Sequence, residues 1–296
     1  MRVFVTGATG LLGRPLCAAL RRQGHAVVAL SRARRPDLPE GVEAVQGDPT
    51  GPGAWQEALA GCDACVSLAG EPLAAGRWTA DRKRRIRESR LLATRNVAAA
   101  VAAGGPRVLV SASAVGYYGD RGDELLTESS APGAGFLPDL AQEWEAEAGR
   151  AAGRARVVLL RTGVALAREG GALPRLVLPF RLFAGGPIGD GAFWQPWIHV
   201  VDAVGLACWA LGDERVAGPL NAAAPEPVRN RELARALGRA LRRPSRLPAP
   251  AFAVRLAVGE MAEAVTASLR VVPRKALDLG YAFRFTQVDA ALADLL

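Results

Sequence analysis

Short apolar runs alternate with amphipathic stretches over the first half of the chain. The runs consist largely of valine, leucine and alanine, which is typical of strands buried on both faces of a sheet. The pattern predicts strands at residues 3–5, 26–30, 42–46, 64–68, 107–111 and 156–160. Helical patterns lie between them, at residues 11–23, 91–103 and 140–152. Strands and helices that alternate in this order predict an α/β protein with a doubly wound parallel sheet.

The alternation weakens after Gly163, where glycine pairs punctuate the chain. Further elements are expected as helices over residues 201–211 and 231–241 and a short strand near Leu220. The division predicted from this change is a core of residues 1–165, to which residues 200–222 return, and a small C-terminal lobe of residues 166–199 and 223–296.

A glycine-rich loop, GATGLLG, follows the first strand and opens the first helix. Gly7 permits a tight turn, Gly10 lets the backbone approach a pyrophosphate, and Gly13 lets the helix pack closely. The helix N-terminus offers free N–H groups and a positive dipole end to phosphates. Glycines at this spacing are a weak signal alone, but a strand before them and a helix after them favour a Rossmann-type dinucleotide site. Thr9, Leu11 and Leu12 belong to the same loop and are expected at the cofactor.

The residues after the second strand select the cofactor. An NAD site has a carboxylate there for the ribose hydroxyls, whereas this chain has Ser31 and Arg32, and no acid before Asp37. A hydroxyl and a guanidinium suit a 2′-phosphate, which arginine binds in a bidentate manner. The alternative is a solvated basic loop. With the glycine loop beside it, the segment favours NADP(H).

Composition and charge narrow the class of protein. Of 296 residues, 50% are hydrophobic and 22% charged, as in an ordinary globular protein. No apolar run reaches the roughly 18 residues that a membrane span needs, and the N-terminus lacks the pattern of a signal peptide. We therefore expect a cytoplasmic protein without a membrane partner.

The net charge of +8 raises the question of a nucleic-acid partner. Its densest basic run, residues 82–87, lies in a helical stretch without interleaved aromatics, so we expect a solvated helix face and no nucleic acid. Four cysteines include a CxxC at Cys62 and Cys65, but no second pair or nearby histidine completes a metal site. We expect buried structural thiols and no metal.

Several further motifs give the chain a family resemblance. It resembles the extended short-chain dehydrogenases/reductases (SDR), and more closely their atypical epimerase-family subgroup, SDR family 39U and its bacterial relatives. The segments that carry this resemblance over the whole chain are residues 6–13, 68–72, 77–78, 89–90, 116–119, 144–145, 160–164, 179–181, 185–189, 197–199 and 272–275.

The resemblance implies roles for individual positions. Residues of the cofactor site would be Leu68, Ala69, Gly70, Glu71, Arg90, Arg161 and Val164, of which Arg161 and Val164 would flank the nicotinamide. Ser113 matches the active-site serine after the fifth strand. His199 and Asp202 would help to fix the junction with the small lobe.

One departure from the family pattern concerns catalysis. SDR enzymes depend on a Tyr-x-x-x-Lys pair, but Phe136 and Leu140 stand where this pair is expected, and neither can move a proton. Tyr117 or Tyr118, or a water, would have to replace the missing donor, although both tyrosines could simply pack against their surroundings. Phe136→Tyr combined with Leu140→Lys would then be expected to raise turnover on a generic carbonyl substrate.

Two functions follow from these patterns. The first is an NADP(H)-dependent oxidoreductase or epimerase that exchanges a hydride at a substrate C–O centre, with Ser113 holding the substrate oxygen. The second is a non-catalytic NADP(H)-binding sensor or scaffold. The sequence does not name the small-molecule substrate, and it is compatible with a homodimer.

Overall fold

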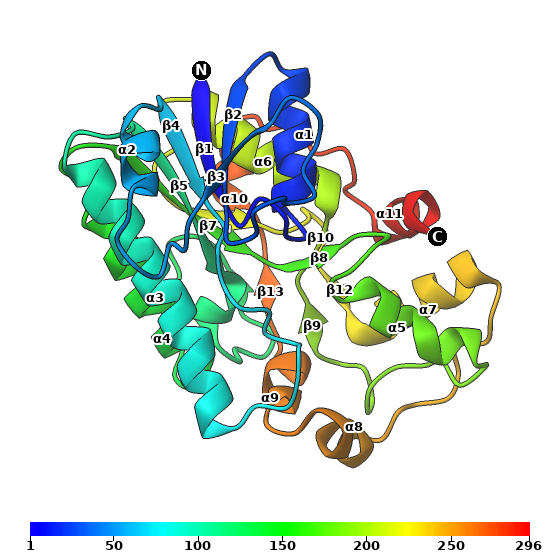
Figure 1. Ribbon diagram of the computed structural model, residues 1–296. Helices are drawn as coiled ribbons and strands as arrows, with labels where there is room; N and C mark the ends of the chain where they lie inside the picture. Colours follow the sequence, from blue (N-terminus) through cyan, green and yellow to red (C-terminus); the bar gives the residue numbers. More distant parts are fainter.

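A seven-stranded parallel sheet forms the centre of the computed structural model, which describes the backbone of all 296 residues and every side chain except those of Ala251 and Ala257 (Figure 1). The strand order is β11-β7-β5-β4-β1-β2-β3. Their bounds are β1 Arg2–Thr6, β2 Ala26–Ser31, β3 Glu43–Gln46, β4 Ala64–Ser67, β5 Val108–Ala114, β7 Arg156–Thr162 and β11 Gly218–Ala222. The predicted doubly wound parallel sheet is confirmed. The order of strands reverses between β1 and β4, where ligands bind in folds of this kind.

Helices cover both faces of this sheet (Figure 1). The apolar side chains of each strand alternate, so that Val3 and Val5 face one helix layer and Phe4 faces the other. The first layer contains α1 (Gly13–Arg22) and α6 (Val200–Gly212), and the second contains α2 (Trp55–Ala60), α3 (Ala80–Ala102) and α4 (Phe136–Gly149). Leu16 and Leu20 of α1 are fully buried against β1 and β2. The carboxyl ends of the strands are left for a ligand.

A separate apolar cluster lies beside the sheet, built mainly from three helices in the second half of the chain (Figure 1). These helices are α5 (Leu173–Arg181), α7 (Asn230–Leu241) and α11 (Val288–Leu295). The remaining elements are η1 Val115–Tyr118, β6 Leu125–Leu126, β8 Val164–Leu166, β9 Trp194–Gln195, β10 Trp197–His199, β12 Val228–Arg229, α8 Ala251–Val258, α9 Met261–Thr266, β13 Arg270–Val271 and α10 Arg274–Asp278. No helix of the described chain combines the length and the apolar character that crossing a membrane requires.

Helix α4 begins four residues earlier than the hydrophobic pattern predicts. Gly135 precedes it at a φ of 109°, a conformation that favours glycine, and the helix starts at Phe136. Pro138 stands in the first turn, where a missing N–H leaves no helical bond unmade. Phe136 and Leu140 therefore lie on the first turns of a helix, not in a loop before it.

The basic run on α3, expected to form a solvated helix face, has one buried arginine. Arg82 and Ile86 are buried, at 8% and 0% exposure, while Arg84 and Arg85 are exposed. Arg82 reaches back to the carboxylate of Glu71 on the loop after β4. One residue of the run is thus structural.

The start of α6 ties the sheet to the last residues of the chain. The imidazole Nδ1 of His199 accepts a hydrogen bond from the N–H of Val201 at 3.1 Å and caps the helix. The His199 ring stacks on Phe285 at 4.0 Å, and the buried Asp202 carboxylate accepts from the N–H groups of Arg284 and Phe285.

This junction makes stability depend on pH. Burial lowers the pKa of His199, and the nearby Asp294 only partly opposes the shift. In the unfolded chain the imidazole has its ordinary pKa of about 6.5. As the pH falls, the unfolded chain therefore binds a proton at His199 at a higher pH than the folded protein does. The contribution of neutral His199 is complete above that pH and is lost as the pH falls below it.

We therefore expect the free energy of unfolding to fall between pH 7 and pH 5, and His199→Asn to flatten that fall. Urea unfolding at several pH values measures both slopes. His25→Asn measures the contribution of the only other histidine, whose pKa is also lowered by burial, so that the two contributions can be separated. Equal slopes in the wild type and His199→Asn would contradict the assignment.

Candidate active site

The loop between β1 and α1 is packed too tightly for side chains at two of its glycines. Gly7 has a φ of 69°, and a Cβ there would lie 2.8 Å from the backbone carbonyl of Leu68. A Cβ on Gly13 would lie 2.1 Å from the carbonyl oxygen of Gly7. A Cβ on Gly10, by contrast, would meet only that same oxygen, at 3.1 Å, within 4 Å. Gly7 and Gly13 therefore shape the loop, and Gly10 faces away from the protein.

Hydrogen bonds join the start of this loop to the end of β4. The two strands concerned, β1 and β4, are the neighbours between which the strand order reverses. The Thr6 hydroxyl oxygen accepts hydrogen bonds from the N–H groups of Leu68 and Ala69, at 3.1 and 3.2 Å. The end of β4 is thereby fixed beside the glycine loop. The two segments form one backbone surface at the carboxyl edge of the sheet, a shape that fits a pyrophosphate.

The remaining residues of the loop differ in their surroundings. Thr9 is exposed, and Leu11 and Leu12 are half-buried. Gly170 and Gly171 lie against the Leu11 side chain, since a Cβ on Gly171 would meet its Cδ2 at 2.8 Å. The first turn of α1 carries no acidic residue, so its positive end is not neutralised by its own side chains.

Arg90 of α3 lies directly under the segment that follows β4. A Cβ on Gly70 would come within 3.3 Å of the Arg90 guanidinium carbon, and Trp144 covers the guanidinium at 5.2 Å. Burial lowers the pKa of Arg90 to about 10, although the charge of Glu71 opposes the shift. Arg90 thus places a positive charge beneath the predicted cofactor segment, while the Glu71 carboxylate is engaged by Arg82.

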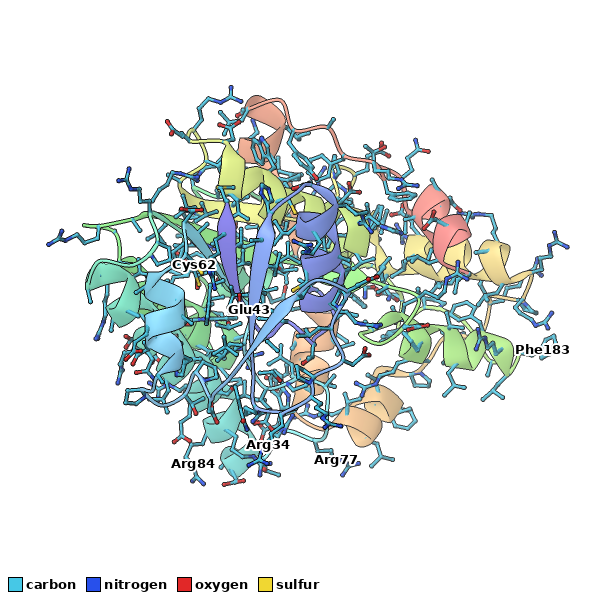
Figure 2. All side chains as sticks on the ribbon, turned by 45° about the horizontal axis from the view of Figure 1, so that its top comes forward. Arg34, Glu43, Cys62, Arg77, Arg84 and Phe183 are labelled. Carbon is cyan, nitrogen blue, oxygen red and sulfur yellow. The ribbon has the colours of Figure 1, made fainter. Side chains whose placement is uncertain are left out.

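The basic loop after β2 keeps its charges available. Arg32, Arg34 and Arg35 are exposed, and none forms an ion pair with another described side chain. The nearest downstream acid, Asp37, pairs with Arg14 at 3.0 Å. Figure 2 shows Arg34 at the carboxyl edge of the sheet. This edge is open to an anion beside Ser31.

Three side chains from different elements converge at the carboxyl end of β5. The Ser113 hydroxyl donates to Oε1 of Glu145 on α4 at 2.6 Å. Arg161 of β7 binds the same carboxylate at two points, with Nε to Oε1 at 2.7 Å and Nη2 to Oε2 at 2.8 Å. The side chains of Arg161 and Glu145 are 3% and 10% exposed. Burial pulls the pKa of Arg161 down, but the bonds to Glu145 and Tyr118 hold it above its ordinary value.

The two candidate tyrosines occupy different environments around Arg161. Tyr118 is fully buried, and its hydroxyl donates to Asn221 at 2.7 Å and accepts from Arg161 at 3.0 Å. Burial raises the pKa of Tyr118 to about 12, against the opposing charge of Arg161. The half-buried Tyr117 ring covers the guanidinium at 3.5 Å. Of the two, Tyr117 has the more accessible position.

An apolar cluster surrounds Phe136 and Leu140 on the first turns of α4. Leu140 is 4% exposed and packs with Trp78 and Ile86, while Phe136 meets the Trp78 ring edge-on at 5.3 Å. Met261 of α9 joins the same cluster. A lysine in place of Leu140 would therefore be buried among apolar side chains.

Sequence reasoning gave Glu145 no role beyond its place in a motif. Its partners lie 32 and 16 residues away, on other strands, so no local spacing reveals the contact. The clue that could have found it is Arg161 itself, since an arginine inside an apolar strand must find a carboxylate when the strand is buried. Val164, also predicted at the cofactor, pairs with Trp197 across β8 and β10.

Comparisons with known proteins agree with this geometry. Residues 3–223 match the model of the NAD dependent epimerase/dehydratase family, and residues 249–295 match a domain of unknown function, DUF1731. The epimerase family protein YfhF of Bacillus subtilis is 38% identical over 100% of this chain and 98% of its own length. The chloroplastic SDR39U1 homologue of Arabidopsis thaliana is 39% identical over 100% of this chain and 87% of its own.

A solved structure extends the similarity to three dimensions. Human epimerase family protein SDR39U1, crystallised with NADPH, superposes with a TM-score of 0.89 at 34% identity, covering 100% of this chain and 99% of the human one. The resemblance predicted from the motifs is confirmed.

The apolar cluster leads to a prediction about stability. Leu140→Lys should lower the free energy of unfolding by roughly 3 kcal/mol or more, because it buries an unpaired charge, and Lys83, which lies 5.5 Å from the Phe136 ring, adds repulsion. Phe136→Tyr alone should be nearly neutral at this half-buried position. Chemical unfolding measures both, with Leu140→Met as the volume-matched control. A Leu140→Lys protein as stable as Leu140→Met would show that the cluster is open to water.

Proposed function

Because the chain belongs to the NAD dependent epimerase/dehydratase family, in its SDR39U1 group, we propose that it binds NADP(H) and exchanges a hydride with a small-molecule substrate at a C–O centre. The observation that carries the proposal is the glycine loop, whose backbone at Gly7 and Gly13 admits no side chain and whose Gly10 faces outward. That surface lies where the strand order reverses, beside the positive end of α1.

The basic loop favours NADP(H) over NAD(H). Ser31 and the exposed, unpaired Arg32 lie where a 2′-phosphate would be, and Asp37 is held by Arg14 instead of facing a ribose. NADPH in the human relative supports the same preference. Leu68, Ala69 and Gly70 would pass beneath the adenosine ribose and pyrophosphate, with the Arg90 charge below them.

The bound nicotinamide would supply the hydride donor or acceptor, and the chain would bind, orient and protonate the substrate. Ser113 lies at the end of β5, beside the predicted nicotinamide position, with Tyr117 close by. The lobe of residues 166–199 and 223–296 would hold the rest of the substrate. Oxidoreductase and epimerase chemistry use the same hydride exchange, and they differ in whether the oxidised substrate leaves.

One observation favours the second function, a non-catalytic NADP(H)-binding sensor or scaffold. Phe136 and Leu140, which stand where the resemblance implies the Tyr-x-x-x-Lys pair, pack among apolar side chains. A cytoplasmic location and a homodimer stay predictions, and one relative is chloroplastic.

We expect tighter binding of NADPH than of NADH, and a loss in Arg32→Ala for NADPH alone. Removal of one charge-assisted hydrogen bond costs roughly 1.5–3 kcal/mol, which is about a 10- to 150-fold rise in Kd. Isothermal titration with both nucleotides measures the effect. Arg22→Ala, an exposed arginine at the other end of α1, is the matched control.

Transfer from deuterated NADPH to a panel of aldehydes, ketones and oxidised nucleotide sugars then tests the hydride step. Gly10→Val is the non-binding control, because its side chain would project toward the phosphates. Equal affinities for NADPH and NADH would refute the 2′-phosphate site. Tight NADPH binding without any deuterium transfer would favour the sensor or scaffold.

A further inference from the structure

We propose that Glu145 takes up and returns the proton of the substrate hydroxyl through Ser113, in place of the missing tyrosine and lysine. The inference rests on the hydride exchange proposed above and gives it a proton path. It assigns a role to the carboxylate of Glu145, which lies outside positions 136 and 140, where the Tyr-x-x-x-Lys pattern would fall.

The direction of one hydrogen bond carries the argument. A serine hydroxyl has a single proton, and Ser113 donates it to Glu145 over 2.6 Å. Toward a substrate, Ser113 therefore offers only lone pairs, so it accepts a hydrogen bond from a substrate hydroxyl. A serine with its proton engaged in this way cannot polarise a carbonyl by donation unless Glu145 first returns a proton.

Arg161 fixes the carboxylate for this task. Its two contacts orient both oxygens of Glu145, and Oε1 accepts from Ser113 and Arg161 together. The charged group nearest to Glu145 is Arg161 of β7. Beyond it, Arg161 also donates to the Tyr118 hydroxyl of η1 and to the Glu128 carbonyl oxygen, both within 3.4 Å. From α3, Arg90 approaches the ring of the adjacent Trp144. The carboxylate is thus held in place by Arg161 and bonded to the hydroxyl of Ser113, which is itself buried.

The proposed step balances in atoms and charge. As the substrate C–H bond breaks and its hydride passes to the oxidised nicotinamide, the hydroxyl proton moves to Oγ of Ser113 and the serine proton moves to Glu145. A carbonyl, reduced cofactor and a neutral Glu145 result. Reversal on the other face of the carbonyl returns hydride and proton and completes an epimerisation with no net proton change, whereas release of the carbonyl compound requires Glu145 to lose its proton to water.

The other candidate acids near Ser113 fit less well. Tyr118 is enclosed, with its hydroxyl proton given to Asn221. The Tyr117 ring lies over the Arg161 guanidinium, in a packing role. Only the Glu145 carboxylate is bonded to the serine, and both groups sit at the carboxyl edge where the nicotinamide is predicted.

The test compares Glu145→Gln, Glu145→Asp and the control Glu147→Gln. Glu147 lies on the same helix and is ion-paired to Arg95 and Arg150, away from Ser113. Oxidation of cyclohexanol and UDP-glucose by NADP⁺ is followed from pH 5 to 9. We expect Glu145→Gln to lower kcat by roughly 10²- to 10⁴-fold, Glu145→Asp to restore part of the rate, and Glu147→Gln to match the wild type. The Kd of NADPH should stay within about twofold in all variants.

A second readout follows the carboxyl itself. Carbon-13 NMR of labelled glutamate side chains, with the Glu145 signal assigned by its absence in Glu145→Gln, should show that this signal shifts in Ser113→Ala, which removes the hydroxyl bonded to the carboxylate, and stays in place in Glu147→Gln. If Glu145→Gln does not fold, Ser113→Ala decides, because it breaks the path while keeping the Arg161–Glu145 pair.

The outcomes separate the two proposals. A wild type that binds NADPH yet oxidises neither alcohol overturns the proposed function and the proton path with it. A measurable wild-type rate that keeps its size in Glu145→Gln, or in Ser113→Ala, overturns the proton path alone.

Discussion

The buried ion pair between Arg161 and Glu145 is the contact on which the carboxyl edge of the sheet depends. A charge that is almost fully withdrawn from water must be paired, and loss of one partner of such a pair costs about 3–5 kcal/mol. Arg161 is paired with Glu145 of α4. The Tyr117 ring stacks on its guanidinium, and the Tyr118 hydroxyl accepts from it and donates to Asn221. A single guanidinium thereby sets the spacing between β7, α4 and η1, and so the position of Ser113.

Helix α4 carries two chemically opposite regions. The first turns, at Phe136 and Leu140, are apolar and pack on Trp78 and on Met261 of α9. Further along the same helix, the buried Glu145 side chain is hydrogen-bonded to Ser113 of β5 and to Arg161 of β7. One helix thus contributes an apolar packing surface at its start and a paired carboxylate closer to its end.

Much of the fold follows from the sequence because its signals are local. Continuous valine and leucine runs determine buried parallel strands, and the glycine loop is recognised by its own spacing between a strand and a helix. The start of α4 was predicted four residues too late, because the hydrophobic pattern does not show that Gly135 and Pro138 fit the start of a helix. Arg82 was misjudged because a basic run does not reveal that one member faces inward to Glu71. The contacts of Glu145 were not predicted for a different reason. Its partners Ser113 and Arg161 come together only when β5 and β7 pair in register.

Two groups of arginines near the proposed cofactor site differ in their partners, and the difference supports an anion site there. Arg161, Arg82 and Arg90 are buried, and each meets a carboxylate or an aromatic ring. Arg32 and its neighbours after β2 are exposed and unpaired among the described side chains, although acidic residues lie within a few positions of them. Asp37 could have neutralised this loop, but it pairs with Arg14 on α1 instead. Positive charge left uncompensated at the end of β2, beside a backbone surface shaped for a pyrophosphate, is the arrangement that a dinucleotide with an added phosphate would neutralise.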